Sequence, residues 1–259
     1  MTGTSTGPAV ETAPLVANYR SYFSGWGLEG RVDGPVWTFR SGVASAMLNA
    51  FTGSSVPVAE ALPVARQRLR GVPWLWDVTP DALPGTAAAL EALGGSQVGS
   101  MPVMAVDAGG LRLLTTPPDD VHVVDVVDDV EGWTAAWMPA MGVELDARER
   151  LLRLHRDRVA VTDRLVQLGV VADGAFRATA ELHLTGTVGG IYLVATEQAY
   201  RRRGFASALV TAAAERALAE GATVLTLQSS PAGESVYRRI GFETVARIDR
   251  YLLPDVTAG

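Results

Sequence analysis

Apolar residues follow two different spacings along this 259-residue chain. Short segments rich in apolar residues, such as Val72 to Val78 and Gly190 to Thr196, are typical of buried strands. Apolar residues that recur every three or four positions, as in Val58 to Arg70 and Ala206 to Glu220, are typical of helices with one buried face. Helices and strands therefore alternate along the chain, which predicts the α/β fold class.

The same order of signals occurs twice. A helix that ends at Gly71 before a strand is matched by a helix that ends at Gly221 before a strand, an offset of 221 − 71 = 150 residues. Leu93 followed by a glycine is matched by Ile240 followed by a glycine, an offset of 240 − 93 = 147 residues. Two nearly equal offsets predict a duplicated structural unit.

The segment Arg201 to Ser207 joins a predicted strand to the helix that follows it. The first backbone N–H groups of a helix lack partners within the helix, and the helix dipole is positive there. Gly204 permits close approach of the backbone, and three consecutive arginines add positive charge. The segment therefore predicts a site for a phosphate or a pyrophosphate. A plain helix start with solvated arginines is the alternative.

Arg201-x-x-Gly204-x-Ala206 resembles the Gln/Arg-x-x-Gly-x-Gly/Ala loop with which the GCN5-related N-acetyltransferases (GNAT) bind the pyrophosphate of acetyl-CoA. Two positions depart from the commonest family sequence, since Arg202 stands where glycine is frequent and Ala206 replaces the second glycine. The resemblance extends to the neighbouring segments in order, and it implies an α/β fold with a mixed sheet and acetyl-CoA as co-substrate. It assigns cofactor contacts to Val194, Ala195, Thr196, Arg201, Arg202, Arg203, Gly204, Phe205, Ala206, Ser207 and Ser230.

The segment Val236 to Phe242 is similar to the family's Leu-Tyr-x-x-x-Gly-Phe signature, in which the tyrosine commonly protonates the CoA thiolate. The resemblance makes Tyr237 the expected catalytic acid, because a phenol with a pKa of about 10 can protonate a thiolate whose pKa is about 8.5. A tyrosine packed at the start of a short helix is the alternative. A backbone N–H of Val194 to Thr196 would stabilise the oxyanion intermediate. Ser230 stands where the family often has an asparagine that contacts pantetheine.

An amine acceptor arrives protonated, so the reaction needs a general base. Glu181 and His183 are the candidates, on the strand before the one that leads into the arginine loop. Their spacing of two places both side chains on one face of that strand. A solvent-facing pair on a hairpin is the alternative, with water relaying the proton. Trp133 and Trp137, four residues apart, either belong to the core or line an acceptor pocket.

The resemblance and the duplication together predict two GNAT-like domains in tandem. We expect a flexible N-terminal tail over residues 1–14, a first domain over 15–117 and an acetyl-CoA-binding domain over 118–259. In the first domain, the segment equivalent to the arginine loop, Thr52 to Pro57, contains no arginine. Leu90 stands at the position that matches the tyrosine (237 − 147 = 90). We therefore interpret the first domain as degenerate and without its own acetyl-CoA.

Composition narrows the chemistry. The absence of cysteine excludes disulfides and thiolate sites and fits a cytoplasmic location. All 22 basic residues are arginine, which excludes a Schiff-base lysine. The net charge of −6 argues against a nucleic-acid surface. No apolar stretch is long enough to predict a membrane span or a signal peptide. The acidic residues near 119–131 lack the glycine and glutamate of a calcium loop, so we expect no metal.

These patterns predict an N-acetyltransferase that moves the acetyl group of acetyl-CoA to a small-molecule amine by direct attack. A non-catalytic acyl-CoA-binding or regulatory module is the alternative, because a domain of this kind can lose its loop. O-acetyl transfer and acetylation of a protein terminus also remain open. The patterns fit a monomer or a homodimer equally well.

Overall fold

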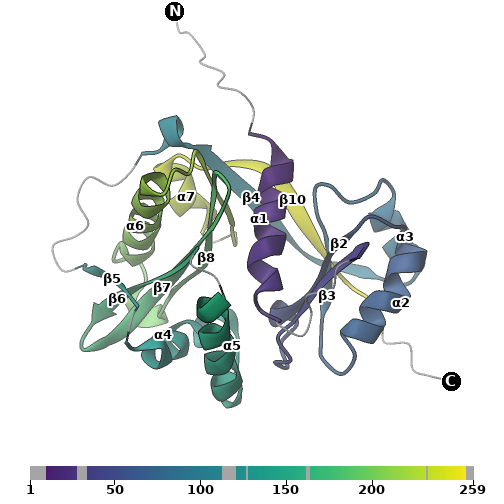
Figure 1. Cartoon of the computed structure of the whole chain (residues 1–259), viewed down its shortest axis with the longest axis horizontal. Helices are drawn as coiled ribbons and strands as arrows, with labels where there is room; N and C mark the ends of the chain where they lie inside the picture. The colour runs from purple at the N-terminus through teal and green to yellow at the C-terminus, as the bar shows by residue number, and fades with distance from the viewer. Residues whose placement is uncertain are drawn as a thin grey trace, which may run out of the picture.

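The computed structural model of the chain describes residues 10–27, 34–112, 121–126, 128–161, 164–231 and 233–254 (Figure 1). In these residues, helices and strands alternate as the spacing of apolar residues predicts. The helices are α1 (Thr12–Ser24), α2 (Val58–Arg68), α3 (Thr86–Ala92), α4 (Val130–Trp137), α5 (Arg148–Val161), α6 (Phe205–Ala219) and α7 (Glu234–Ile240). The strands are β1 (Val36–Arg40), β2 (Asn49–Ser54), β3 (Leu75–Val78), β4 (Ser96–Asp107), β5 (Val123–Asp125), β6 (Leu165–Ala172), β7 (Ala175–Thr185), β8 (Val188–Thr196), β9 (Val224–Gln228) and β10 (Glu243–Leu252).

The ten strands form one mixed sheet in the order β1-β2-β3-β10-β4-β9-β8-β7-β6-β5. The pairs β2–β3 and β8–β9 are parallel, and each is joined by a crossover helix, α2 or α6. All other neighbours are antiparallel. The fold is therefore the α/β class with the mixed sheet that the sequence predicts.

The element order β1-β2-α2-β3-α3-β4 is repeated as β7-β8-α6-β9-α7-β10. From the crossover helix onward, the starting residues of equivalent elements lie 147 to 149 positions apart: α2 and α6 by 205 − 58 = 147, and β3 and β9 by 224 − 75 = 149. The two strands before that helix start 139 positions from their equivalents, β1 and β7 by 175 − 36 = 139 and β2 and β8 by 188 − 49 = 139. The duplicated unit predicted from the glycine spacing is thus confirmed. Gly94 and Gly241, the pair behind the offset of 147, both follow a short helix with positive φ, as a left-handed helix end requires.

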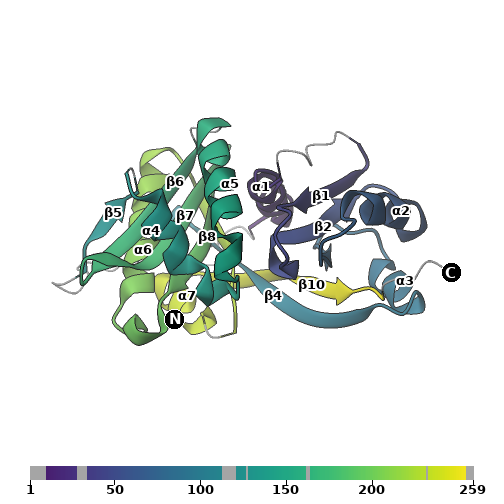
Figure 2. The ribbon, with the colours of Figure 1, turned by 90° about the horizontal axis from the view of Figure 1, so that it is seen from below.

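The two repeats exchange their last strands. β10, from the second repeat, lies between β3 and β4, and β4, from the first repeat, lies between β10 and β9. Figure 2 shows both long strands running from one part of the molecule to the other. A division at residue 117, which lies outside the described residues, leaves neither part with all strands of its own sheet. Of the tail expected over residues 1–14, residues 1–9 lie outside the described residues and residues 12–14 belong to α1, which has Pro14 in its first turn, where proline is tolerated.

Three apolar clusters hold the layers together. The first packs α6 and α7 against β7, β8 and β9, and four buried alanines of α6 allow a close approach to the sheet. The second lies on the opposite face, where α1, α4 and α5 cover β7 and β8. The third packs α2 and α3 against β2 and β3. Among the described residues, every helix is too short or too polar to cross a membrane.

Candidate functional site

The strands β8 and β9 pair at one end and separate at the other. Residues 188–190 of β8 pair with residues 224–226 of β9. In the described ladders, the remainder of β8, residues 191–196, pairs with β7 alone. This part of β8, which includes Val194, Ala195 and Thr196, consequently presents backbone N–H and C=O groups toward the gap between the strands. An unpaired strand edge can bind an extended ligand by adding it as a further strand.

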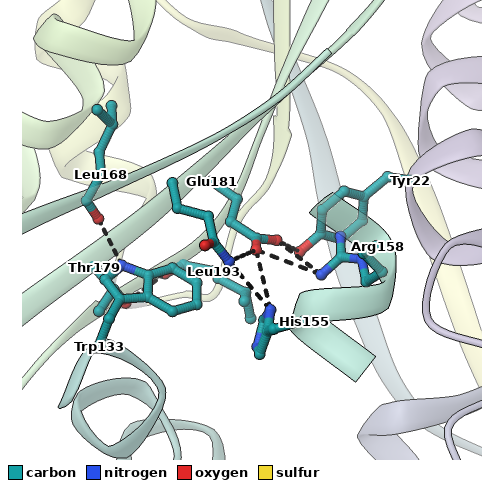
Figure 3. Close-up of polar contacts among 9 residues, drawn as sticks. Tyr22, Trp133, His155, Arg158, Leu168, Thr179, Glu181 and Leu193 are labelled. Carbon is teal, nitrogen blue, oxygen red and sulfur yellow. Dashed lines mark hydrogen bonds and ion pairs between the residues drawn. The ribbon is translucent and has the colours of Figure 1, made fainter. Parts of the chain in front are cut away.

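β8 carries a bulge at the start of this free edge. Tyr192 stands opposite Glu181 of β7 and Ala195 stands opposite Thr179, so two residues of β8, beginning with Leu193, face a single residue of β7. Leu193 has a φ of 47°, and its carbonyl accepts a hydrogen bond from Thr179 Oγ1 at 3.0 Å (Figure 3). A bulge redirects backbone groups out of the ladder, which is what a backbone oxyanion donor at this place requires.

The loop from Arg201 to Ser207 follows β8 and starts α6. Gly204 precedes the helix with φ 83° and ψ −2°, a left-handed conformation that favours glycine, and no side chain caps the helix. The N–H groups of the first turn, which begins at Phe205, therefore have no partner within the helix. The side chains of Arg201, Arg202 and Arg203 are exposed. The loop combines free N–H donors, a positive helix end and exposed cationic side chains, which together suit a pyrophosphate.

A shallow pocket of about 300 Å³ lies beside this loop. It is formed by the end of α4, the short helical turn after it and the turn that follows β8. Arg201 stands at its wall, and its Nε donates to the carbonyl oxygen of Thr196 at 3.2 Å. The wall residues are Ala135, Ala136, Pro139, Ala140, Glu197, Gln198 and Arg201.

Tyr237 lies on α7 in the same apolar cluster as Phe205 and, at its border, Val194. Burial raises the pKa of Tyr237 to about 12, so its phenol keeps its proton at neutral pH. Ser230 is exposed in the turn before α7, and its Oγ accepts a hydrogen bond from the backbone N–H of Gly233 at 3.2 Å. The elements β8, α6 and α7, which carry most of the predicted cofactor residues and the predicted acid, thus share one apolar cluster with β9.

Glu181 has a different environment. It is fully buried on the face of β7 opposite to α6, and its carboxylate accepts hydrogen bonds from Tyr22 at 2.6 Å and Gln167 at 2.9 Å. Arg158 of α5 pairs with it at 3.2 Å, and His155 Nδ1 lies 3.5 Å away (Figure 3). These partners come from α1, α5 and β6, so three separate elements converge on one carboxylate.

The groups around Glu181 determine the protonation state of its carboxyl group. Burial by itself raises the pKa of the Glu181 carboxyl, but the charge of Arg158 and the hydrogen bonds from His155 and Tyr22 hold this pKa well below its usual range. A carboxylate of that kind is a poor proton acceptor at neutral pH. The expectation that Glu181 is the general base stays a prediction, and this environment works against it.

His183, the other candidate base, is also mostly buried. Its Nε2 lies 3.0 Å from Ser21 Oγ of α1, and burial together with the charge of Arg158 lowers the pKa of His183 to about 4. The imidazole is therefore neutral at pH 7. Both candidates share one face of β7, as their spacing predicts, and that face lies under α1 and α5 and not in solvent.

The sequence alone does not reveal the group around Glu181. Arg158 lies over the rings of Tyr22 and Trp26, at 4.8 and 4.4 Å from the ring centres. His155 is enclosed by Trp26, Trp133 and Trp137, with ring centres between 5.1 and 5.8 Å away. Both tryptophans of α4 are fully buried and belong to the core. Two signals were available, a helical spacing of Tyr22 and Trp26 and one of His155 and Arg158, but neither points to β7.

In the part of the chain that the structure describes, no three His, Asp or Glu side chains gather as a metal site would require. The groups that could bind acetyl-CoA are of a different kind: the backbone N–H groups at the start of α6, the arginines beside them and the unpaired edge of β8.

Residues 129–242 match the sequence model of the acetyltransferase (GNAT) family. No curated protein sequence matches the chain. A solved GCN5-related N-acetyltransferase from Kribbella flavida is similar over 96% of this chain and 97% of its own, with a TM-score of 0.70 and 21% identity. A putative GNAT-family acetyltransferase from Novosphingobium aromaticivorans covers 92% of this chain and 99% of its own, with a TM-score of 0.60 and 16% identity. A tandem GNAT protein from the clavulanic acid biosynthesis pathway covers 85% of this chain and 80% of its own, with a TM-score of 0.56 and 15% identity. At these identities the likeness is one of fold, and it extends over both repeats.

Proposed function

We propose that the chain transfers the acetyl group of acetyl-CoA to the amine of a small molecule, with the second repeat as the site of the reaction. The match of residues 129–242 to the acetyltransferase (GNAT) family model supports this proposal. The main structural support for the proposal is the connection between β8 and α6. There an unpaired strand edge with a bulge at Leu193 leads directly into a helix start with free N–H groups and three exposed arginines.

The residues have separate tasks in this proposal. The first turn of α6 and Arg201 to Arg203 bind the pyrophosphate, and the free edge of β8 pairs with the pantetheine arm. A backbone N–H at the bulge stabilises the oxyanion that forms when the amine attacks the thioester, a contribution of about 2.7–4 kcal/mol for such donors. Tyr237 donates its proton to the departing thiolate, whose basicity rises in the same apolar surroundings. We assign Glu181 to the positioning of β7 and β8, and deprotonation of the amine to water.

The first test is acetyl-CoA binding measured by calorimetry. Wild type is expected to bind at micromolar Kd, about −8.2 kcal/mol, and Gly204→Glu is expected to lose binding because a carboxylate would face the pyrophosphate. Gly85 provides a matched control, since it precedes α3 with φ 83° and ψ 0°, nearly the same conformation as Gly204. Gly85→Glu carries the same backbone strain and should bind normally. Loss of binding in both variants, or in neither, would refute the assignment of the loop.

The second test concerns Tyr237. Tyr237→Phe removes only the hydroxyl, so acetyl-CoA affinity should stay within about twofold while turnover falls by about 10²-fold, the range of a general acid. Turnover is measured as thiol release from acetyl-CoA with a panel of small primary amines. Unchanged turnover would remove Tyr237 from the mechanism. If wild type binds acetyl-CoA but acetylates none of the amines, a non-catalytic acyl-CoA-binding module is the better description.

We further propose that the first repeat is a degenerate unit that binds no acetyl-CoA. β2 and β3 pair only through residues 50–51 and 75–76, so they too separate. Arg20 of α1 spans their ends, donating from Nε to the Thr52 carbonyl at 2.9 Å and from a terminal nitrogen to Thr79 Oγ1 at 3.0 Å. The same guanidinium pairs with Asp81 at 2.6 Å and lies where a Cβ on Gly53 would be. The calorimetric stoichiometry should therefore be one acetyl-CoA per chain, and a value of two would contradict this proposal.

A further inference from the structure

Helix α1 belongs to the first repeat in sequence, yet it packs on β7 and β8 of the second repeat. It lies outside residues 129–242, and Figure 1 shows it between the two parts of the molecule. Two of its buried residues, Asn18 and Tyr22, form hydrogen bonds with the hairpin that carries the bulge.

Asn18 joins both strands of this hairpin. Its Nδ2 donates to the carbonyl oxygen of His183 at 3.1 Å and to Thr185 Oγ1 at 2.8 Å, both on β7. A longer contact of 3.4 Å reaches the carbonyl oxygen of Val188 on β8. Its Oδ1 accepts a hydrogen bond from the Tyr192 hydroxyl at 2.6 Å. The amide thus uses both its donor and its acceptor side, and it is fully buried.

The aromatic ring of Tyr22 also contacts Tyr192. The rings of Tyr22 and Tyr192 are stacked, with centres 3.7 Å apart and planes 6° from parallel. The Tyr22 hydroxyl donates to Glu181, and Glu181 is the residue that stands opposite Tyr192 in the ladder. Gly190 leaves room for this arrangement, because a Cβ there would overlap Asn18 Oδ1 and the Tyr192 ring.

Tyr192 is the last residue of β8 before the bulge. Leu193, which follows it, has positive φ, a conformation that a branched side chain keeps only when its surroundings impose it. Thr179 holds the carbonyl of Leu193 on one side. On the other side, Tyr192 is fixed by the hydrogen bond that its hydroxyl donates to Asn18 Oδ1 and by the stacked ring of Tyr22.

We propose that Asn18 and Tyr22 are positioning residues of the acetyl-transfer site, which set the direction of the bulge by fixing Tyr192. The inference rests on the proposed function of the second repeat. It means that the acetyltransferase site includes residues about 160–170 positions upstream in sequence (181 − 22 = 159 and 188 − 18 = 170). The chemistry is unchanged, since neither residue touches the reacting groups.

Tyr19 supplies a matched control for Tyr22 on the same helix. Both tyrosines are buried, and each donates to a buried carboxylate that is paired with an arginine. The carboxylate of Tyr19 is Asp77 of β3, whose partner Arg250 lies 3.3 Å away on β10. Tyr19→Leu and Tyr22→Leu therefore remove the same groups, but the hydroxyl of Tyr22 donates to the bulged hairpin and its ring stacks on Tyr192, whereas the hydroxyl of Tyr19 donates to β3.

The experiment compares Tyr22→Leu, Tyr22→Phe and Tyr19→Leu in the full chain. Thiol release is followed with acetyl-CoA and the primary amine that wild type acetylates fastest. Tyr22→Leu should lower kcat at least tenfold, with the KM for acetyl-CoA changed by less than about twofold. Tyr22→Phe keeps the stacked ring and should retain kcat within about threefold. Tyr19→Leu should lower the melting temperature to a similar extent and leave kcat unchanged.

Hydrogen–deuterium exchange of the free protein gives a second reading that needs no substrate. Backbone amides 192–195 should lose protection in Tyr22→Leu and keep it in Tyr19→Leu. Should Tyr22→Leu not fold, Tyr192→Phe, which removes only the hydroxyl that donates to Asn18, takes its place. Equal protection in wild type and both Leu variants, or an equal loss of kcat in both, would overturn the proposal. An inactive wild type would refute the proposed function instead, while the exchange data still decide how the bulge is held.

Discussion

Replacing Arg158 by methionine should be the most damaging single change to the second repeat. Arg158 is 2% exposed and its partner Glu181 is 0% exposed, with 3.2 Å between them. Removing one partner of a buried ion pair leaves an uncompensated charge and costs about 3–5 kcal/mol. The loss of the guanidinium over two aromatic rings acts in the same direction. Since each kcal/mol lowers the melting temperature of a chain of this size by about 2–4 °C, a fall of about 10 °C is expected.

The measurement is thermal and urea unfolding followed by circular dichroism at pH 7. Arg216→Met is the control, because Arg216 pairs with Asp125 at a similar 3.3 Å with both side chains about half exposed. A pair in solvent contributes about 0–1 kcal/mol, so this variant should unfold close to wild type. The double variant Arg158→Met/Glu181→Gln removes the stranded charge and should recover part of the loss. Equal stability of the two single variants would refute the reasoning.

The pH dependence of the stability of Arg158→Met gives an independent test, because the direction of the change can be predicted. In wild type the pKa of Glu181 is lowered, so its contribution is present above the ordinary carboxyl pKa of 4.5 and is lost as the pH falls through lower values. Without Arg158, burial is no longer offset and the pKa of Glu181 rises above 4.5. A raised carboxyl pKa stabilises the folded state at low pH, because the folded state then binds the proton more tightly. The stability deficit of Arg158→Met should therefore shrink from pH 7 to pH 4, and a deficit that grows would contradict this.

Three further predictions concern other positions. Gly241→Ala should lower the melting temperature more than Gly221→Ala. Both glycines have positive φ, but only at Gly241 would the new Cβ overlap another group, the carbonyl oxygen of Gly110. Equal shifts in melting temperature would contradict this. The pKa of His183 is lowered from 6.5 to about 4, so its contribution to the free energy of unfolding is full above pH 6.5 and declines as the pH falls toward 4. In urea unfolding, the free energy of unfolding of His183→Gln should therefore fall less between pH 6.5 and pH 4 than that of wild type, and an equal fall would contradict this. Thr179→Val removes the hydroxyl that donates to the carbonyl oxygen of Leu193 in the bulge. It should lower the free energy of unfolding in urea by about 0.5–1.5 kcal/mol and also lower kcat. An unchanged kcat would contradict the role of the bulge in stabilising the oxyanion.

The sequence by itself determined the parts of this protein whose signals are local. Gly204 and the arginines before it lie within four residues, so a helix start with an anion site can be predicted without knowing what packs around it. The repeat was also visible, because glycines that end helices must adopt positive φ and therefore recur at fixed offsets. The spacing of Glu181 and His183 placed both on one face of a strand.

Only the tertiary structure decided what that face meets. Tyr22 and Glu181 are 159 positions apart, and their contact depends on the path of α1 across the hairpin of the other repeat. The exchange of β4 and β10 is equally invisible in sequence, because a strand pattern does not specify which strand lies beside it. Period and propensity specify the conformation of a segment, whereas the choice of its neighbour depends on side-chain packing between segments far apart. For this reason the sequence could offer Glu181 as a candidate base on a strand, but it could not reveal its burial or Arg158, the residue that holds its carboxyl charged.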